Sequence, residues 1–119
     1  MRIDIKRIYD EPSPEDGYRV LVDRLWPRGL SKEAAALDRW AKEVAPSPEL
    51  RKAWHAASDA EWGMFAARYR AELAGQTAEA LAALAEDLQA HDVVTLLYSL
   101  HDPEHNHAVV LAEVLREHT

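Results

Sequence analysis

The chain has 119 residues, with 21 acidic and 14 basic side chains, a formal net charge of −7 and no cysteine. The missing cysteine excludes thiolate nucleophiles, disulfides and Cys-ligated metal sites, and the negative charge argues against non-specific nucleic-acid binding. There is no signal-peptide pattern and no apolar run of the ~18 residues that a membrane span needs, so we expect a cytoplasmic protein.

The length predicts one domain over residues 1–119. The acidic residues gather toward the C-terminus, where residues 71–119 hold nine of them against one basic residue, Arg116. Residues 1–30 are balanced, with six acidic and six basic side chains. A local cationic pocket in the first half is therefore compatible with the overall acidity.

The N-terminal third predicts two strands. Residues 2–8 place two isoleucines on one face at a spacing of two, which indicates a strand with one solvated face. Residues 18–25 contain the apolar run 20–22 with β-branched ends, which is typical of a buried strand. A loop is expected at 26–29, because Pro27 disfavours helix at the residue before it.

The middle of the chain predicts helices. Ser31 is an N-cap candidate for a helix whose end, near Asp38 or beyond Val44, the pattern leaves open. Ser47 with Pro48 begins a short helix that runs to about His55.

Two longer helices follow. Ser58-x-x-Glu61 is a capping-box signature that opens a helix to Leu73. Another begins at Thr77, and its leucines recur at spacings of three and four.

A second continuous apolar run, residues 93–98, predicts another buried strand, and a last helix runs from about Glu104 or His105 to Glu117. Buried strands separated by helices favour a parallel pair joined by a right-handed crossover. We therefore predict an α/β fold: a small, mostly parallel sheet covered by helices on both faces, with a helical segment (about 31–75) between the two buried strands.

The candidate site lies in the two polar segments that follow the buried strands. Ligands of open α/β sheets bind outside the carboxyl ends of the strands, and parallel neighbours would bring both segments to one edge. The residues we select as ligand-binding are Asp23, Arg24, Trp26, Arg28, Tyr98, Ser99, His101, Asp102, His105, Asn106 and His107.

Each residue of the first segment has a functional and a structural interpretation. Arg28 is either a solvated loop arginine or an anion clamp, because guanidinium presents a planar fork to phosphate or carboxylate. Asp23 and Arg24 form either a strand-end ion pair or a site carboxylate beside a cation. Trp26 either packs against the sheet edge, which we favour, or forms an aromatic wall.

The histidines of the second segment resemble a metal site, but Pro103 interrupts the helix that would align His101 with His105, so we assign no metal ligand. The structural interpretation is that Asp102 caps the last helix, with Pro103 at its first position. A Ser99–His101 nucleophile and base pair is generic. Phosphate-binding glycine loops and the Gly-x-Ser-x-Gly elbow are missing from the sequence.

Two long motifs resemble a known family. Val-Leu-Val-Asp-Arg-Leu-Trp-Pro-Arg-Gly (20–29) and Leu-Leu-Tyr-Ser-Leu-His-Asp-Pro-Glu-His-Asn-His-Ala-Val-Val-Leu (96–111) are similar to the signature blocks of the YeaO-like branch of domain-of-unknown-function family 488. The resemblance covers nearly the whole chain, and it implies a compact bacterial α/β domain without a settled activity. Longer relatives look as if they carry Cys around the position of Tyr98, and many relatives have Lys in place of His101, so roles that need a thiol or a permanent cation there do not transfer.

We expect this site to bind a small anionic molecule or nucleotide, and the sequence does not decide whether a reaction follows. One alternative is a protein-interaction module whose partner surface uses Trp40, Trp54, Trp62 and Tyr69. A further alternative, ranked last, is local contact of the arginine loop with nucleic acid. The sequence identifies neither a cofactor nor an oligomeric state.

Overall fold

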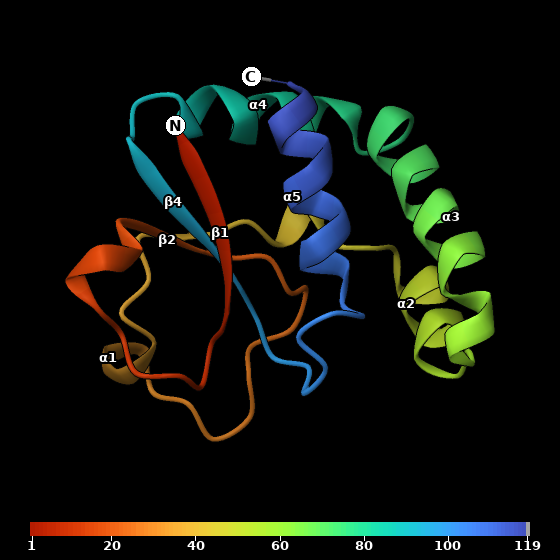
Figure 1. Ribbon diagram of the computed structural model, residues 1–119, viewed down its shortest axis with the longest axis horizontal. Coiled ribbons are helices and arrows are strands. Elements are labelled where there is room, and N and C mark those ends of the chain that lie inside the picture. The colour runs from red at the N-terminus through yellow and green to blue at the C-terminus, as the bar shows by residue number, and fades with distance from the viewer. Residues whose placement is uncertain (119) are drawn as a thin grey trace.

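The computed structural model describes residues 1–118, and Thr119, the last residue of the predicted domain, lies outside them. Figure 1 shows the arrangement of the elements, with the two ends of the chain at the same side of the molecule. The strands are β1 (Arg2–Arg7), β2 (Tyr18–Leu21), β3 (Arg39–Trp40) and β4 (Val93–Tyr98), and the helices are α1 (Lys32–Ala35), α2 (Pro48–His55), α3 (Trp62–Ala74), α4 (Ala78–Leu88) and α5 (His107–Glu117).

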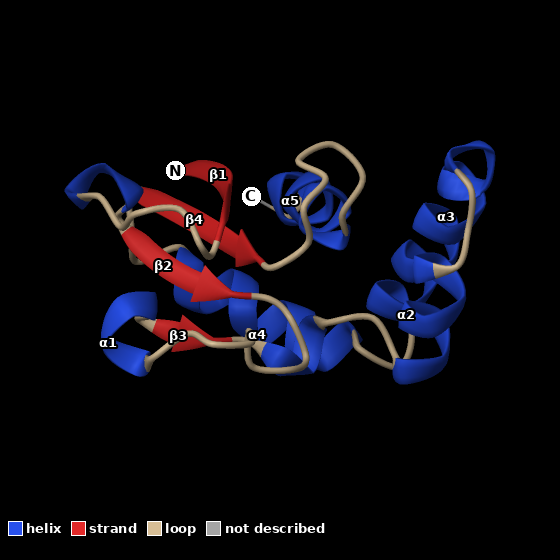
Figure 2. Ribbon diagram, turned by 90° about the horizontal axis from the view of Figure 1, so that it is seen from below, coloured by secondary structure: helices blue, strands red, loops and turns tan. Residues whose placement is uncertain are grey.

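All strand pairs in the sheet are parallel. The strand order is β1-β4-β2-β3, and Figure 2 shows the four strands side by side in this order. The predicted α/β class is therefore confirmed, and the two predicted buried strands are direct neighbours, with Val20 beside Leu96. Strand β3 was not predicted. Its two residues lie where the sequence left the end of a helix open, and they pair with β2 at the edge of the sheet.

The two faces of the sheet are covered very differently. On the first, which we call the helical face, Val20, Val94 and Leu96 belong to the main core, together with buried side chains of α2, α3, α4 and α5. On the second, the loop face, Leu21 and Leu97 meet a smaller apolar cluster that includes Ala35 of α1. Helices thus cover both faces, but the loop face is covered only by the four residues of α1, the short 3-10 helix Pro14–Asp16 and their flanking turns.

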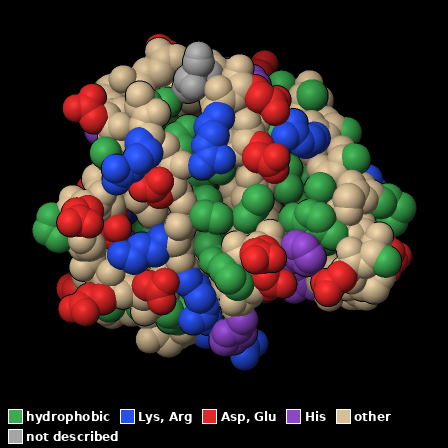
Figure 3. Space-filling model, viewed as in Figure 1, with side chains coloured by type: hydrophobic (Ala, Val, Ile, Leu, Met, Phe, Trp, Pro, Cys, Tyr) green, Lys and Arg blue, Asp and Glu red, His purple; other side chains and the backbone are tan. Residues whose placement is uncertain are grey.

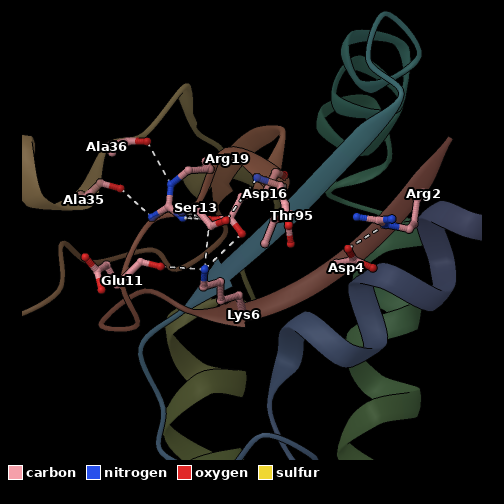
Figure 4. Close-up of polar contacts among 11 residues, drawn as sticks. Arg2, Asp4, Lys6, Glu11, Ser13, Asp16, Arg19, Ala35, Ala36 and Thr95 are labelled. Atoms are coloured by element: carbon pink, nitrogen blue, oxygen red, sulfur yellow. Dashed lines mark hydrogen bonds and ion pairs between the residues drawn. The ribbon is translucent and has the colours of Figure 1, made fainter.

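A buried charge group, Lys6, Asp16 and Arg19, completes the loop face (Figure 4). Asp16 accepts hydrogen bonds from Lys6 Nζ at 3.1 Å and from the Arg19 guanidinium, which also donates to the backbone oxygens of Ala35 and Ala36. Burial alone would raise the pKa of Asp16, but the bonds from the Ser13 N–H, Lys6 and Arg19 outweigh it and hold that pKa below its usual value.

The helix boundaries follow local sequence signals, with two corrections. The Ser47–Pro48 start is confirmed, because the Ser47 hydroxyl accepts from the Leu50 N–H. Helix α1 is much shorter than its pattern suggested, because Ala36 adopts a left-handed conformation with φ 49°. No helix within residues 1–118 is long and apolar enough to cross a membrane.

The second correction concerns the last helix, which begins at His107 and not at Glu104 or His105. Asn106 is its N-cap, since its side-chain oxygen accepts from the Val109 N–H at 3.2 Å. Asp102 closes an earlier turn by accepting from the backbone N–H groups of Glu104 and His105. The predicted Asp102 cap is therefore wrong, because its turn ends before the helix begins.

Candidate functional site

A cleft opens where neighbouring strands send their connections to opposite faces of the sheet. The chain after β2 passes to α1 on the loop face, whereas the chain after β4 passes to α5 on the helical face. Such a divergence leaves a crevice beyond the carboxyl ends of the strands. The crevice here has a volume of about 1080 Å³.

Ten of the eleven selected residues line this cleft. Its walls are formed by the segments after β1, β2 and β4 and by residues between 45 and 62, from the chain before α2 to the start of α3. The lining residues are Arg7, Tyr9, Asp23, Arg24, Leu25, Trp26, Pro27, Arg28, Ala45, Pro46, Arg51, Trp54, His55, Ala57, Ser58, Asp59, Trp62, Ser99, Leu100, His101, Asp102, His105, Asn106 and His107. Tyr98 is the exception, because it is buried in the core of the helical face.

Asp23 joins the two polar segments. Its carboxylate accepts the Ser99 hydroxyl at 2.5 Å and the Ser99 backbone N–H at 3.1 Å. It also lies 3.4 Å from His107 Nε2, and both side chains are largely buried. The strand-end ion pair with Arg24 does not form, and Ser99 bonds to Asp23 and not to His101, so the generic Ser99–His101 pair is absent from the described residues.

The surroundings of His107 favour its neutral form. Its Nε2 lies 2.9 Å from the Val22 carbonyl oxygen, and because that oxygen only accepts, Nε2 carries the hydrogen and Nδ1 keeps the lone pair. Burial lowers the pKa of His107 and the charge of Arg51 adds to this, while Asp23 and the Val22 carbonyl oppose it. The Nε2–H is thus committed to a backbone carbonyl.

Four arginines from three segments line the cleft: Arg7 from β1, Arg24 and Arg28 from the chain after β2, and Arg51 from α2. Arg7 donates to the Leu100 carbonyl and lies over the Tyr9 ring, and Arg24 donates to the carbonyls of Ala45 and Pro46. In contrast, no hydrogen bond or ion pair joins the guanidinium of Arg28 or Arg51 to a residue between 1 and 118. These two groups keep their donors available.

Aromatic rings form part of the wall. Trp54 and Trp62 lie 4.9 Å apart between ring centroids, and His105 stacks on Trp62 at 4.7 Å with its plane tilted by 18°. Trp54 Nε1 is buried without an acceptor, the one such side-chain atom in residues 1–118. An unpaired buried donor costs about 1–3 kcal/mol, which a ligand acceptor at this wall would offset.

Trp26 has both roles considered for it. Its indole N–H donates to the Leu30 carbonyl and its ring packs edge-on against Trp40 on the loop face, while the residue also lines the cleft. His101 and Asp102 are exposed at the rim, and histidine side chains gather along the lower part of the face in Figure 3. The described residues contain no group of three or more metal-ligating side chains.

The sequence reasoning missed the part of the cleft contributed by other elements. Arg7 could have been predicted at the cleft, because it ends β1 beside Tyr98 of the neighbouring strand β4, at the same edge of the sheet. Arg51, Asp59 and Trp62 had none, because only the tertiary packing of α2 and α3 brings them to the cleft.

The charges of the cleft differ from those of the whole chain. Its lining contains four arginines against three aspartates, a net of +1 with neutral histidines, on a protein of net charge −7. Four of the six histidines also line it. Anions are therefore favoured here and disfavoured elsewhere on the surface.

Comparison with known proteins identifies relatives over the full length. The chain is 49% identical to "Uncharacterized protein YeaO" of Escherichia coli over 116 residues, which is 98% of each chain. It is 40% identical to "Uncharacterized protein Rv3073c" of Mycobacterium tuberculosis and "Uncharacterized protein Mb3100c" of Mycobacterium bovis, over 96% of this chain and 93% of theirs.

No solved structure shows a significant match. Residues 2–119 match the family model described as "Inactive DUF488-N3 subclade". Together with the relatives, this match shows that the chain belongs to the DUF488 family and, within it, to the subclade described as inactive.

Proposed function

We propose that this protein binds a small anionic molecule in the cleft and does not transform it. The observation that carries the proposal is that Arg7, Arg24, Arg28 and Arg51, from three segments of a net-negative chain, line the same cleft. Two of these arginines are oriented by backbone carbonyls, and two have unpaired guanidinium groups. Guanidinium groups form strong, charge-assisted hydrogen bonds with phosphate and carboxylate oxygens.

Two observations favour binding without turnover. A serine nucleophile needs an adjacent base, but Ser99 donates to the Asp23 carboxylate, and the nearby His107 directs its own Nε2–H at the Val22 carbonyl. The description of the family as inactive supports the same conclusion.

Isothermal titration with inorganic phosphate, pyrophosphate and citrate tests the proposal. Because a hydrogen bond to a charged group contributes about 1.5–3 kcal/mol, Arg28→Ala and Arg51→Ala should each weaken the bound anion by roughly 10- to 150-fold. The matched control is Lys52→Ala, which removes an exposed cation next to Arg51 that does not line the cleft.

The control should bind within about twofold of the unaltered protein, since a charge outside the cleft makes no direct contact. If all three anions fail to bind at millimolar concentration, the proposal is wrong. It is equally wrong if Lys52→Ala weakens binding as much as Arg51→Ala, because the attraction would then come from the general field of the surface.

The four aromatic residues considered for a protein-interaction surface do not form an exposed patch. Trp54 and Tyr69 are buried in the main core, and Trp40 and Trp62 are partly buried against their neighbours. We therefore do not propose a partner surface at these aromatic side chains.

A further inference from the structure

The lining of the cleft has two chemically different parts. One contains the unpaired guanidinium group of Arg51, which lies on α2 together with Trp54. The other surrounds His105, whose Nδ1 lies 3.2 Å from Asp59 and 3.9 Å from Asp102. Carboxylates repel a phosphate but accept hydrogen bonds from hydroxyl and amino groups. A ligand that fits both parts therefore has an anionic end and a neutral end rich in donors.

The neutral end is also expected to be planar. Trp54, Trp62 and His105 form a continuous run of rings, in which Trp62 is flanked by the other two. His105 stacks on Trp62 and is at the end of the run, and 36% of its side-chain surface is exposed. A flat heterocycle can extend this run on the outer side of His105, because base–aromatic stacking requires only a ring face.

The size of the cleft agrees with a composite ligand. Sites that enclose drug-sized molecules measure about 300–1000 Å³, and this cleft of about 1080 Å³ is far larger than a single phosphate or carboxylate needs. In Figure 1 the segments after β2 and between α2 and α3 lie on opposite sides of the segment after β4, and residues of all three segments line the cleft.

We infer that the anionic ligand is a nucleoside phosphate. Its phosphate lies at Arg51, its base extends the ring stack at His105, and its sugar hydroxyls or base amino group face Asp59 and Asp102. This inference rests on the proposed anion site and adds the part of the ligand that the arginines do not recognise.

The test compares ligands that share a phosphate and differ in the base. Isothermal titration is carried out with AMP, GMP, CMP and UMP, and with ribose 5-phosphate and inorganic phosphate. Since one stacked base contributes roughly 5- to 150-fold in affinity, at least one nucleotide should bind that much more tightly than ribose 5-phosphate. His105→Ala should remove the advantage and His105→Phe should keep it, because phenylalanine retains the ring.

Both variants change a partly exposed side chain of a loop, and their thermal midpoints provide the check on folding. If ribose 5-phosphate binds as tightly as all four nucleotides, the inference is overturned while the anion site stands. If the base advantage survives in His105→Ala, the stacking site is elsewhere and the inference is again overturned. If no phosphate compound binds, the inference and the proposed function both fail.

Discussion

The two regions beside the ends of β2 use the same residue types in opposite ways. At the buried charge group, Asp16 and Arg19 are almost fully enclosed and every charge has its partner within the protein. At the cleft, Arg28 and Arg51 line a large open volume, and their guanidinium groups meet no acceptor in residues 1–118.

The difference lies in the covering of the two faces. On the loop face, the connection from β1 to β2 folds over the sheet and delivers Asp16 to Arg19 and Lys6, so the charges are matched where water is excluded. Beyond the carboxyl ends the connections diverge, and no residue between 1 and 118 fills the gap. Paired charges in the first region stabilise the fold, whereas unpaired charges in the second remain available to a ligand.

The largest expected difference in the free energy of unfolding comes from replacing an arginine by methionine in each of the two regions. Arg19→Met should lower the free energy of unfolding by about 3–5 kcal/mol, because it leaves a buried carboxylate short of its closest cation. Arg28→Met should change it by less than ~0.5 kcal/mol, because the exposed side chain has no partner to lose. Urea unfolding followed by circular dichroism measures both.

Equal losses in the two variants would contradict the comparison. Such a result would mean either that Arg28 supports the fold or that Lys6 alone neutralises Asp16 in the variant. Lys6→Met in the Arg19→Met background separates these explanations, since only in the second would the added loss be large.

Glycines sharpen the same contrast. Gly17, next to the buried charge group, and Gly29, beside the cleft, have φ angles of 64° and 72°. A β-carbon at Gly17 would lie 2.3 Å from the Val93 carbonyl oxygen, whereas one at Gly29 would meet nothing within 4 Å. Gly29→Ala should therefore cost about 1–2 kcal/mol from the backbone alone, and Gly17→Ala should cost clearly more because β4 must also shift.

Thermal unfolding of the two alanine variants makes this comparison. Similar midpoints would show that the backbone of β4 yields easily at Val93, and that the packing beside the charge group is looser than the contact distance indicates.

The start of α5 provides a smaller effect within the cleft. Asn106→Ala should cost about 1–2 kcal/mol, because it removes both the N-cap bond to the Val109 N–H and a bond to the Asp102 carbonyl. Asp102→Ala should cost less, since its side chain bonds only the N–H groups of an exposed turn. If denaturant titration instead finds Asp102→Ala the more damaging variant, the helix begins earlier than the structure has it.

That pair of residues illustrates how far the sequence could predict this fold and site. The run 93–98 was predicted with the observed limits of β4, and two such runs correctly indicated parallel neighbours, because continuous apolarity and turn residues are local signals. The predicted start of α5 was wrong because Asp102-Pro103 matches the usual sequence of a helix N-cap. Only the structure shows that these residues form a separate turn and that the helix starts at His107.

The site was predictable only where it follows the strands. Asp23, Ser99 and His107 could be expected to meet because the strands before them are adjacent. Arg51 and Trp62 could not be expected at the cleft, since their positions depend on how α2 and α3 pack over the helical face. Strand β3 has two residues, too few to show any periodicity.

The last expected effect is a pH dependence that belongs to the cleft alone. The pKa of His107 is lowered in the folded protein, so the unfolded chain binds more protons whenever the pH is below about 6.5 and above the folded pKa. Stability should therefore fall as the pH drops through this window and be flat above it, with a slope of at most about 1.4 kcal/mol per pH unit for one group. Asp16 has the same sign in a more acidic window, since its lowered pKa confers stability that is lost only as the pH falls below about 3.8.

Urea titrations between pH 5 and 8 measure the slope, and His107→Gln should reduce it, because the amide keeps a donor for the Val22 carbonyl and does not titrate. His55 requires a parallel His55→Gln variant, since burial and Arg51 lower its pKa as well. His101→Gln, which changes an exposed histidine at the rim, is the control that should leave the slope unchanged. If neither cleft variant flattens the profile, folding does not lower the pKa of His107, and the pH dependence does not arise from the buried histidines of the cleft.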